Sequence, residues 1–146
     1  MTWATDRLAA LKAGEATPPP IVETLGLGLL DDWGEGWVRK SWAPRAGLET
    51  ADGSLSGGYI AALADQVLAF AAMTVAPDGK GFRTINLQVN FLRVGRSAPL
   101  SIEARVVART RQLITVRAEF RREDSELIAE ASAQQMLTPS GGSGTG

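Results

Sequence analysis

The sequence predicts an α+β domain in which one long apolar helix is wrapped by an antiparallel β-sheet. Residues 57–75 are almost wholly apolar and have the length of a buried helix. Four later segments alternate apolar and polar residues with period two, and turn-forming residues separate them at intervals of about ten residues. Such strands form an antiparallel sheet with one covered face. The 146 residues, 45% of them apolar, suit one domain with a real core.

A short helix and a rigid spacer are expected at the N-terminus. Residues 6–13 predict the helix, because two leucines lie three positions apart and a glycine follows the last turn. The three prolines at 18–20 end it and separate it from the rest. We therefore divide the chain into an N-terminal helix with a Pro-rich spacer, residues 1–20, and a main domain, residues 21–138.

Two strands are expected before the long helix. Residues 21–30 predict a turn of helix and then a strand, and residues 35–42 predict a second strand. Residues 43–56 are a loop rich in Pro, Gly, Asp and Ser. The long helix then covers residues 57–75, and the Pro-Asp-Gly sequence at 77–79 ends it.

Four strands are expected after the helix, at residues 84–92, 100–109, 112–121 and 126–137. In the first of them one face carries Ile85, Leu87, Val89 and Phe91, and the other carries Thr84, Asn86, Gln88 and Asn90. Short turns between the four segments predict a meander of neighbouring strands. Two strands, a long helix and four more strands follow the element order of the hotdog fold.

Composition excludes several classes of function. The net charge of −1 gives no electrostatic case for binding nucleic acid or membranes. The chain has no Cys, so it has neither disulfides nor thiolate chemistry. Its N-terminus lacks a signal-peptide pattern, and no apolar run reaches the roughly 18 residues of a membrane span. We expect a cytoplasmic protein with a flexible Gly/Ser tail at residues 139–146.

One carboxylate stands out in the long helix. A Gly-Gly pair opens this helix, and Asp65 lies two turns inside it. A buried acid is destabilising unless it is paired, hydrogen-bonded or protonated, so something must compensate for Asp65. The chain also has no His. An enzyme of this composition would have to work with a carboxylate, hydroxyl groups and backbone amides.

The region around this carboxylate resembles the PaaI-like (phenylacetate-pathway type) hotdog thioesterases. The family pattern is Asn-x-x-Gly-x-x-His-Gly-Gly, six further residues, and an Asp or Glu. Residues 50–58 read Thr-Ala-Asp-Gly-Ser-Leu-Ser-Gly-Gly, and Asp65 follows at the family's spacing. The later family strand opens with Ser or Thr and runs into an Arg-Pro-like turn, which correspond here to Thr84 and to residues 90–93. The resemblance spans residues 25–138, with Thr50 in place of Asn and Ser56 in place of His.

The resemblance implies an acyl-CoA thioesterase, and the residues suit that chemistry. Hydrolysis of a thioester builds negative charge on the carbonyl oxygen, and the N-terminal amide of the helix at Gly57 can act as an oxyanion hole. Gly57 and Gly58 let a substrate approach the backbone closely. Asp65 would act as general base or as nucleophile. Thr84 could orient the water or Asp65, while Thr50 and Ser56 would contact the substrate.

Each of these residues also has a structural interpretation. The Gly pair suits a tight loop-to-helix junction, and Ser56 suits an N-cap. Asp65 could be a structural acid satisfied by Thr or backbone N–H, and Thr84 an ordinary strand residue. Twelve Arg against three Lys leave Arg93 and Arg96, in the turn after the Thr84 strand, as candidates for binding coenzyme A phosphates. Solvated surface positions are the alternative for most of the Arg residues.

Two other functions fit the same fold. Hotdog dehydratases and hydratases resemble one another in using a catalytic His, and its absence here argues against them. A non-catalytic protein that binds acyl-CoA or only assembles stays open, because Thr50 and Ser56 differ from the family. Small residues in the helix favour an aromatic or short- to medium-chain acyl group (Ala61, Ala62, Ala64, Ala69). We expect no metal and no cofactor other than the coenzyme A of the substrate.

The spacing of the helix residues predicts an oligomer with shared active sites. Gly57 and Asp65 lie eight residues apart, about 12 Å along a helix axis. An oxyanion donor and a base must each come within about 3–4 Å of the same carbonyl group, which one helix cannot arrange. An antiparallel helix from a second chain can, and a two-fold axis then makes two equivalent sites. The resemblance implies the same dimer, often paired again into a homotetramer.

Overall fold

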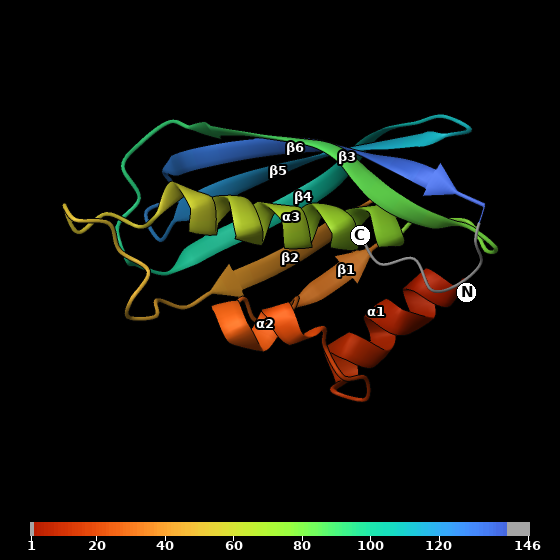
Figure 1. Ribbon diagram of the computed structural model, residues 1–146, viewed down its shortest axis with the longest axis horizontal. Coiled ribbons are helices and arrows are strands. Elements are labelled where there is room, and N and C mark those ends of the chain that lie inside the picture. The colour runs from red at the N-terminus through yellow and green to blue at the C-terminus, as the bar shows by residue number, and fades with distance from the viewer. Residues whose placement is uncertain (1, 140–146) are drawn as a thin grey trace.

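The computed structural model describes residues 2–139, which form one antiparallel sheet, a long central helix and two short N-terminal helices (Figure 1). The α+β prediction is confirmed. The expected tail, apart from residue 139, lies outside the described residues. The elements are α1 (Trp3–Ala13), α2 (Pro20–Leu25), β1 (Asp32–Gly34), β2 (Trp37–Trp42), α3 (Gly57–Met73), β3 (Gly81–Phe91), β4 (Leu100–Arg109), β5 (Leu113–Arg122) and β6 (Leu127–Thr138).

The six strands pair in the order β1-β2-β4-β5-β6-β3. The predicted meander is correct for β4, β5 and β6 and wrong for β3, which pairs with β6 at the far edge of the sheet. β4 pairs instead with β2, so the two strands that follow α3 lie far apart. Within residues 2–139, β3 therefore has a neighbour on one side only, and its outer backbone groups lie at a free sheet edge.

The predicted strand within residues 21–30 is also wrong. The structure has α2 there, and the residues that follow it are irregular up to β1. Leu27 and Leu30 are nevertheless buried, because they anchor this irregular segment to the core. β1 starts at Asp32 and forms a tight hairpin with β2, in which Gly34 lies opposite Trp37.

α3 lies across one face of the sheet and packs against β2, β3, β4, β5 and β6 (Figure 1). Its buried side chains include Leu63, Val67 and Leu68. The helix is not buried all round, however. One stripe, at spacings of four, three and four residues, is exposed or only half-buried in the single chain (Gly58, Ala62, Asp65 and Ala69). We refer to these four residues as the open stripe.

A β-bulge interrupts β3 shortly after it begins. Thr84 lies opposite Gln135 and Asn86 lies opposite Gln134, so Ile85 is the extra residue. The extra residue reverses which side chains face α3: Phe82 and Thr84 do so before the bulge, and Leu87 does so after it. Simple alternation placed Thr84 on the same face as Asn86, and the bulge shows that this prediction is wrong.

The predicted N-terminal helix is confirmed and begins earlier, at Trp3. The Thr2 hydroxyl caps it by accepting from the backbone N–H of Thr5. The Trp3 indole donates to the carbonyl of Lys80 at 2.8 Å, which ties α1 to the turn after α3. Among residues 2–139, no helix is both long and apolar enough to cross a membrane.

Candidate active site

The N-terminus of α3 presents two unpaired backbone donors. Ser56 occupies the N-cap position, but its side chain makes no capping hydrogen bond. Its carbonyl accepts from the N–H groups of Tyr59 and Ile60, both at 3.1 Å. Within the described part of the chain, the N–H groups of Gly57 and Gly58 have no acceptor. These amides stand at the positive end of a 17-residue helix, which is the arrangement of an anion-stabilising site.

Gly57 has a close neighbour in the Phe91 ring. A Cβ atom at this position would lie 3.0 Å from Cζ of Phe91, whose ring comes from the end of β3. A Cβ atom at Gly58 would lie 3.7 Å from the Ser56 hydroxyl oxygen, an ordinary contact, and Gly58 is exposed. The start of α3 is held in place by Tyr59, whose hydroxyl accepts from the Trp42 indole at 2.8 Å.

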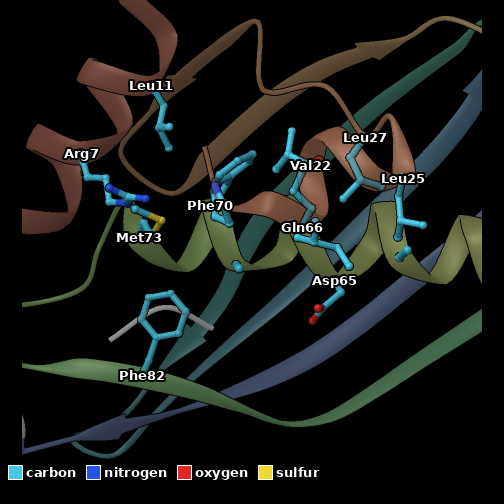
Figure 2. Close-up of a pocket in the computed structure, with 14 residues that line it drawn as sticks. Arg7, Leu11, Val22, Leu25, Leu27, Asp65, Gln66, Phe70, Met73 and Phe82 are labelled. Carbon is cyan, nitrogen blue, oxygen red and sulfur yellow. The ribbon is translucent and has the colours of Figure 1, made fainter. Parts of the chain in front are cut away.

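Asp65 lies in the open stripe and points from α3 toward β3 (Figure 2). The expectation of a buried acid is wrong for the single chain, where Asp65 is exposed because the sheet does not cover this side of the helix. The surrounding protein still desolvates the carboxylate enough to raise its pKa above the ordinary value of 3.8, and a hydrogen bond with the Thr84 side chain lowers it in part. A carboxylate with these surroundings suits a general base or nucleophile.

Thr84 is brought to Asp65 by the bulge in β3. It is half-buried, and its hydroxyl oxygen lies 2.8 Å from Oε1 of Gln135 on β6. The predicted pair of Asp65 and Thr84 is thus together in one chain. Gly57 lies two turns away on the same helix, as the sequence spacing required.

Thr50 lies in a tight loop ahead of α3. Its hydroxyl donates to Asp52 at 2.6 Å and lies 2.8 Å from the Ser54 hydroxyl. Hydrogen bonds from Ser54 and Thr50 hold the pKa of Asp52 well below its usual range. The loop reaches the turn after β3 through a hydrogen bond from Leu55 N–H to the Gly95 carbonyl, at 2.7 Å. In this chain the Thr50 side chain is therefore engaged by its own loop.

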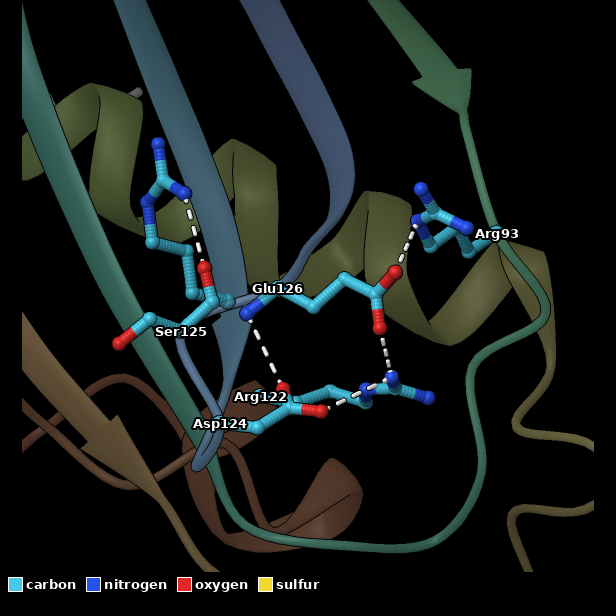
Figure 3. A network of polar contacts seen from close by, with 6 residues as sticks. Arg93, Arg122, Asp124, Ser125 and Glu126 are labelled. Carbon is cyan, nitrogen blue, oxygen red and sulfur yellow. Dashed lines mark hydrogen bonds and ion pairs between the residues drawn. The ribbon is translucent and has the colours of Figure 1, made fainter.

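The two Arg candidates differ in their surroundings. Arg93 Nε forms an ion pair with Glu126 at 2.7 Å, and Glu126 also contacts Arg122 (Figure 3). Arg96 is exposed and pairs through its backbone with Ser54 in the loop before α3. Of the two, Arg96 is the one whose backbone is joined to the segment leading into α3, and its side chain is free of the Glu126 network.

An apolar pocket of about 260 Å³ opens beside Asp65. It lies between α1 and α2 on one side and α3 with Phe82 of β3 on the other (Figure 2). Apart from Asp65, its polar lining is contributed by two side chains, Arg7 and Gln66, and apolar side chains make up the rest (Leu11, Pro19, Ile21, Val22, Leu25, Leu27, Ala62, Ala69, Phe70, Met73, Phe82). The sequence did not indicate that the N-terminal helices contribute to the site.

Two buried polar residues were also missed. Gln135 is fully buried beside Thr84, on the inner face of a strand that also carries the buried Ala131 and Ala133. Lys40 is 2% exposed and donates to the Leu29 carbonyl; burial lowers its pKa to about 8, against a smaller opposing effect of Asp31. The alternation of β2 does place Lys40 on the same face as the buried Val38 and Trp42, which was the available signal.

Residues 52–129 match the family model described as the thioesterase superfamily, which is more than half of the chain. No curated protein matches the chain in sequence.

Solved structures are similar over most of the chain. A phenylacetic acid degradation-related protein from Ralstonia eutropha has 28% sequence identity and a TM-score of 0.79, covering 88% of this chain and 98% of its own. A thioesterase family protein from Silicibacter pomeroyi has 25% identity and a TM-score of 0.76, covering 89% and 97%. A Streptococcus mutans protein bound to acetyl-CoA shares the fold at 21% identity, with a TM-score of 0.70 and coverage of 77% and 89%.

Proposed function

Because the chain belongs to the thioesterase superfamily and is a thioester hydrolase, we propose that it hydrolyses an aromatic or short- to medium-chain acyl-CoA. The hotdog fold and the resemblance to PaaI-like thioesterases are confirmed. The observation that carries the proposal is Asp65 in the lining of an apolar pocket. That pocket measures about 260 Å³, at the small end of ligand sites, which favours a compact acyl group. A structural neighbour with acetyl-CoA bound supports the coenzyme A ester.

In the proposed reaction, the backbone N–H of Gly57 binds the thioester carbonyl oxygen and stabilises the charge that develops there. Asp65 takes a proton from water, whose oxygen attacks the carbonyl carbon, or attacks it directly to form an acyl-enzyme that water then hydrolyses. The C–S bond breaks and coenzyme A leaves as a thiolate. In the first route the thiolate takes up the proton held by Asp65, and in the second it takes up a proton released by the water that hydrolyses the acyl-enzyme. Thr84 orients the Asp65 carboxylate.

The proposed site combines two chains. Gly57 and Asp65 are separated by eight residues of one helix, so a second α3 running antiparallel must supply the missing partner of each. The open stripe supports this arrangement, because small residues let a second helix or a substrate come close. The free edge of β3 also supports it, since Leu87, Phe91 and Leu92 are 36%, 55% and 49% exposed there. Pairing β3 with β3 of a second chain would hydrogen-bond the free backbone groups of this edge and cover these side chains.

The remaining proposed substrate contacts lie near the N-terminus of α3. Arg96 is proposed to bind phosphate groups of coenzyme A, with Arg93 joining it if the Glu126 ion pair opens. Ser56, Gly58 and Thr50 would line the path of the thioester. Pairing of dimers into a tetramer, a cytoplasmic location and the absence of any cofactor beyond coenzyme A stay predictions.

A steady-state assay against a panel of acyl-CoA esters tests the proposal. The Asp65→Asn variant should lose about two orders of magnitude in turnover or more, because the amide cannot act as base or nucleophile. Asp6→Asn, which changes an exposed carboxylate on α1, is the matched control and should behave as the unmodified protein. Wild-type turnover in Asp65→Asn would show that this carboxylate is structural.

A further inference from the structure

Gln135 is the most deeply buried polar side chain near the active site. It lies on β6 directly opposite Thr84, is 0% exposed, and faces α3. Its Oε1 lies 2.8 Å from Oγ1 of Thr84. Its Nε2, which carries two N–H donors, is buried without a partner in the described part of the chain. Orphaned buried N–H groups are rare in proteins, so this amide needs an explanation.

The number of protons around the Thr84 hydroxyl explains this unpaired amide. The Thr84 hydroxyl has a single proton, yet two acceptors surround it: Gln135 Oε1 and the Asp65 carboxylate. An ionised carboxylate can only accept. Turning the Gln135 amide by half a turn places Nε2 against Thr84 Oγ1. The buried N–H then has its acceptor, and the hydroxyl proton is free to point at Asp65. The Gln135 carbonyl oxygen then takes the unpaired position, and buried carbonyl oxygens without a hydrogen bond are less rare in proteins than buried N–H groups without one.

We propose that Gln135 is a positioning residue of the active site, whose amide N–H donates to Thr84 and thereby directs the Thr84 hydroxyl proton onto the Asp65 carboxylate. The β-bulge at Ile85 serves this chain of contacts, because it keeps Thr84 on the face that carries Gln135. The proposal rests on the proposed function, in which Asp65 is the reacting carboxylate.

The Thr84 hydrogen bond has a large influence on Asp65 because few other groups act on this carboxylate. Two causes shift its pKa, partial desolvation by the surrounding protein and the Thr84 hydrogen bond, and among residues 2–139 no charged side chain contributes to the shift. Of the described residues that line the adjoining pocket, Arg7 of α1 is the one cation. The orientation of the Thr84 hydroxyl is therefore the main means by which this fold holds the carboxylate ionised and in place.

The test compares Gln135→Met with Gln134→Met. The first removes the amide at similar length; the second removes the neighbouring amide, which bonds Asn86 away from the site. Asp65 is titrated by carboxyl NMR, which does not depend on activity. We expect Gln135→Met to raise the Asp65 pKa toward its value in Thr84→Val and to lower kcat about two- to tenfold. Gln134→Met should change neither. In a Thr84→Val background, Gln135→Met should have no further effect.

The unmodified protein offers a second measurement that needs no variant at Gln135. The side-chain amide NMR signal of Gln135 should shift with the midpoint of Asp65 titration, and this shift should vanish in Asp65→Asn. An unshifted Gln135 signal, an unchanged Asp65 pKa in Gln135→Met, or effects that add to those of Thr84→Val would overturn the proposal. Full turnover in Asp65→Asn would instead overturn the proposed function, while the titrations would still decide whether the three side chains are coupled.

Discussion

Replacing Gly57 by proline removes one oxyanion donor with little expected damage to the fold. Gly57 is the first residue of α3, where proline is well tolerated because its missing N–H has no intrahelical acceptor. The preceding residue must be extended, and Ser56 already has a ψ of 129°. Gly57→Pro should therefore fold and keep its stability within about 1 kcal/mol while losing the amide that we assign to the carbonyl oxygen.

The matched control is Gly57→Ala. Both variants add a Cβ atom that meets the Phe91 ring at about 3.0 Å, so both force the ring to shift by a few tenths of an ångström. Alanine keeps the N–H, and proline does not. The ratio of their kcat values therefore reports the exchange of the N–H donor for the proline ring methylene, and loss of one oxyanion-hole donor lowers kcat by about 10²–10³.

Release of coenzyme A can be followed with a thiol-reactive chromophore, and the protein gives no background because it has no Cys. Thermal unfolding of both variants checks that the fold survives. Equal kcat values for folded Gly57→Pro and Gly57→Ala would refute the assignment of this amide as the oxyanion donor.

Three further predictions follow from the ionisable groups and the free edge. The kcat/KM profile should rise with pH to a midpoint above 3.8, because partial desolvation by the surrounding protein raises the Asp65 pKa, and Thr84→Val should move the midpoint higher. The free energy of unfolding should increase by up to about 3 kcal/mol between pH 8 and 10.5. Burial lowers the pKa of Lys40 from 10.5 to about 8, so the unfolded chain binds more protons than the folded chain in this window. Denaturant titrations of Lys40→Met should lack that increase. Leu87→Glu should shift the protein toward monomers in light scattering, whereas Gln88→Glu on the opposite face should not.

Much of the fold could be predicted from alternation and turn signals. The last three strands were placed within one residue, because each has one buried face and short turns at both ends. The strand expected within residues 21–30 failed for a physical reason. The leucines in this segment indicate that it is buried, but not that it forms a strand. An irregular segment buries Leu27 and Leu30 equally well without strand pairing.

The site was predictable in its residue types more than in its geometry. The spacing from Gly57 to Asp65 fixed both on one helix, but their exposure depends on how far the sheet curls around α3. The bulge that turns Thr84 inward is an insertion that period-two alternation cannot reveal. Gln135 was missed because a single glutamine in a strand looks like a surface residue until its neighbours in the sheet are known.

We propose that each active site combines Asp65 of one chain with Gly57 of another. Mixing Asp65→Asn with Gly57→Pro chains, after dissociation and reassociation, tests it directly. Each homodimer should be nearly inactive, whereas each mixed dimer contains one site with both residues intact. At equal mixing half of all dimers are mixed, so activity should recover to about a quarter of the unmodified level. No recovery in mixtures whose subunit exchange is verified by mass spectrometry, or a fully active monomer, would contradict the shared site.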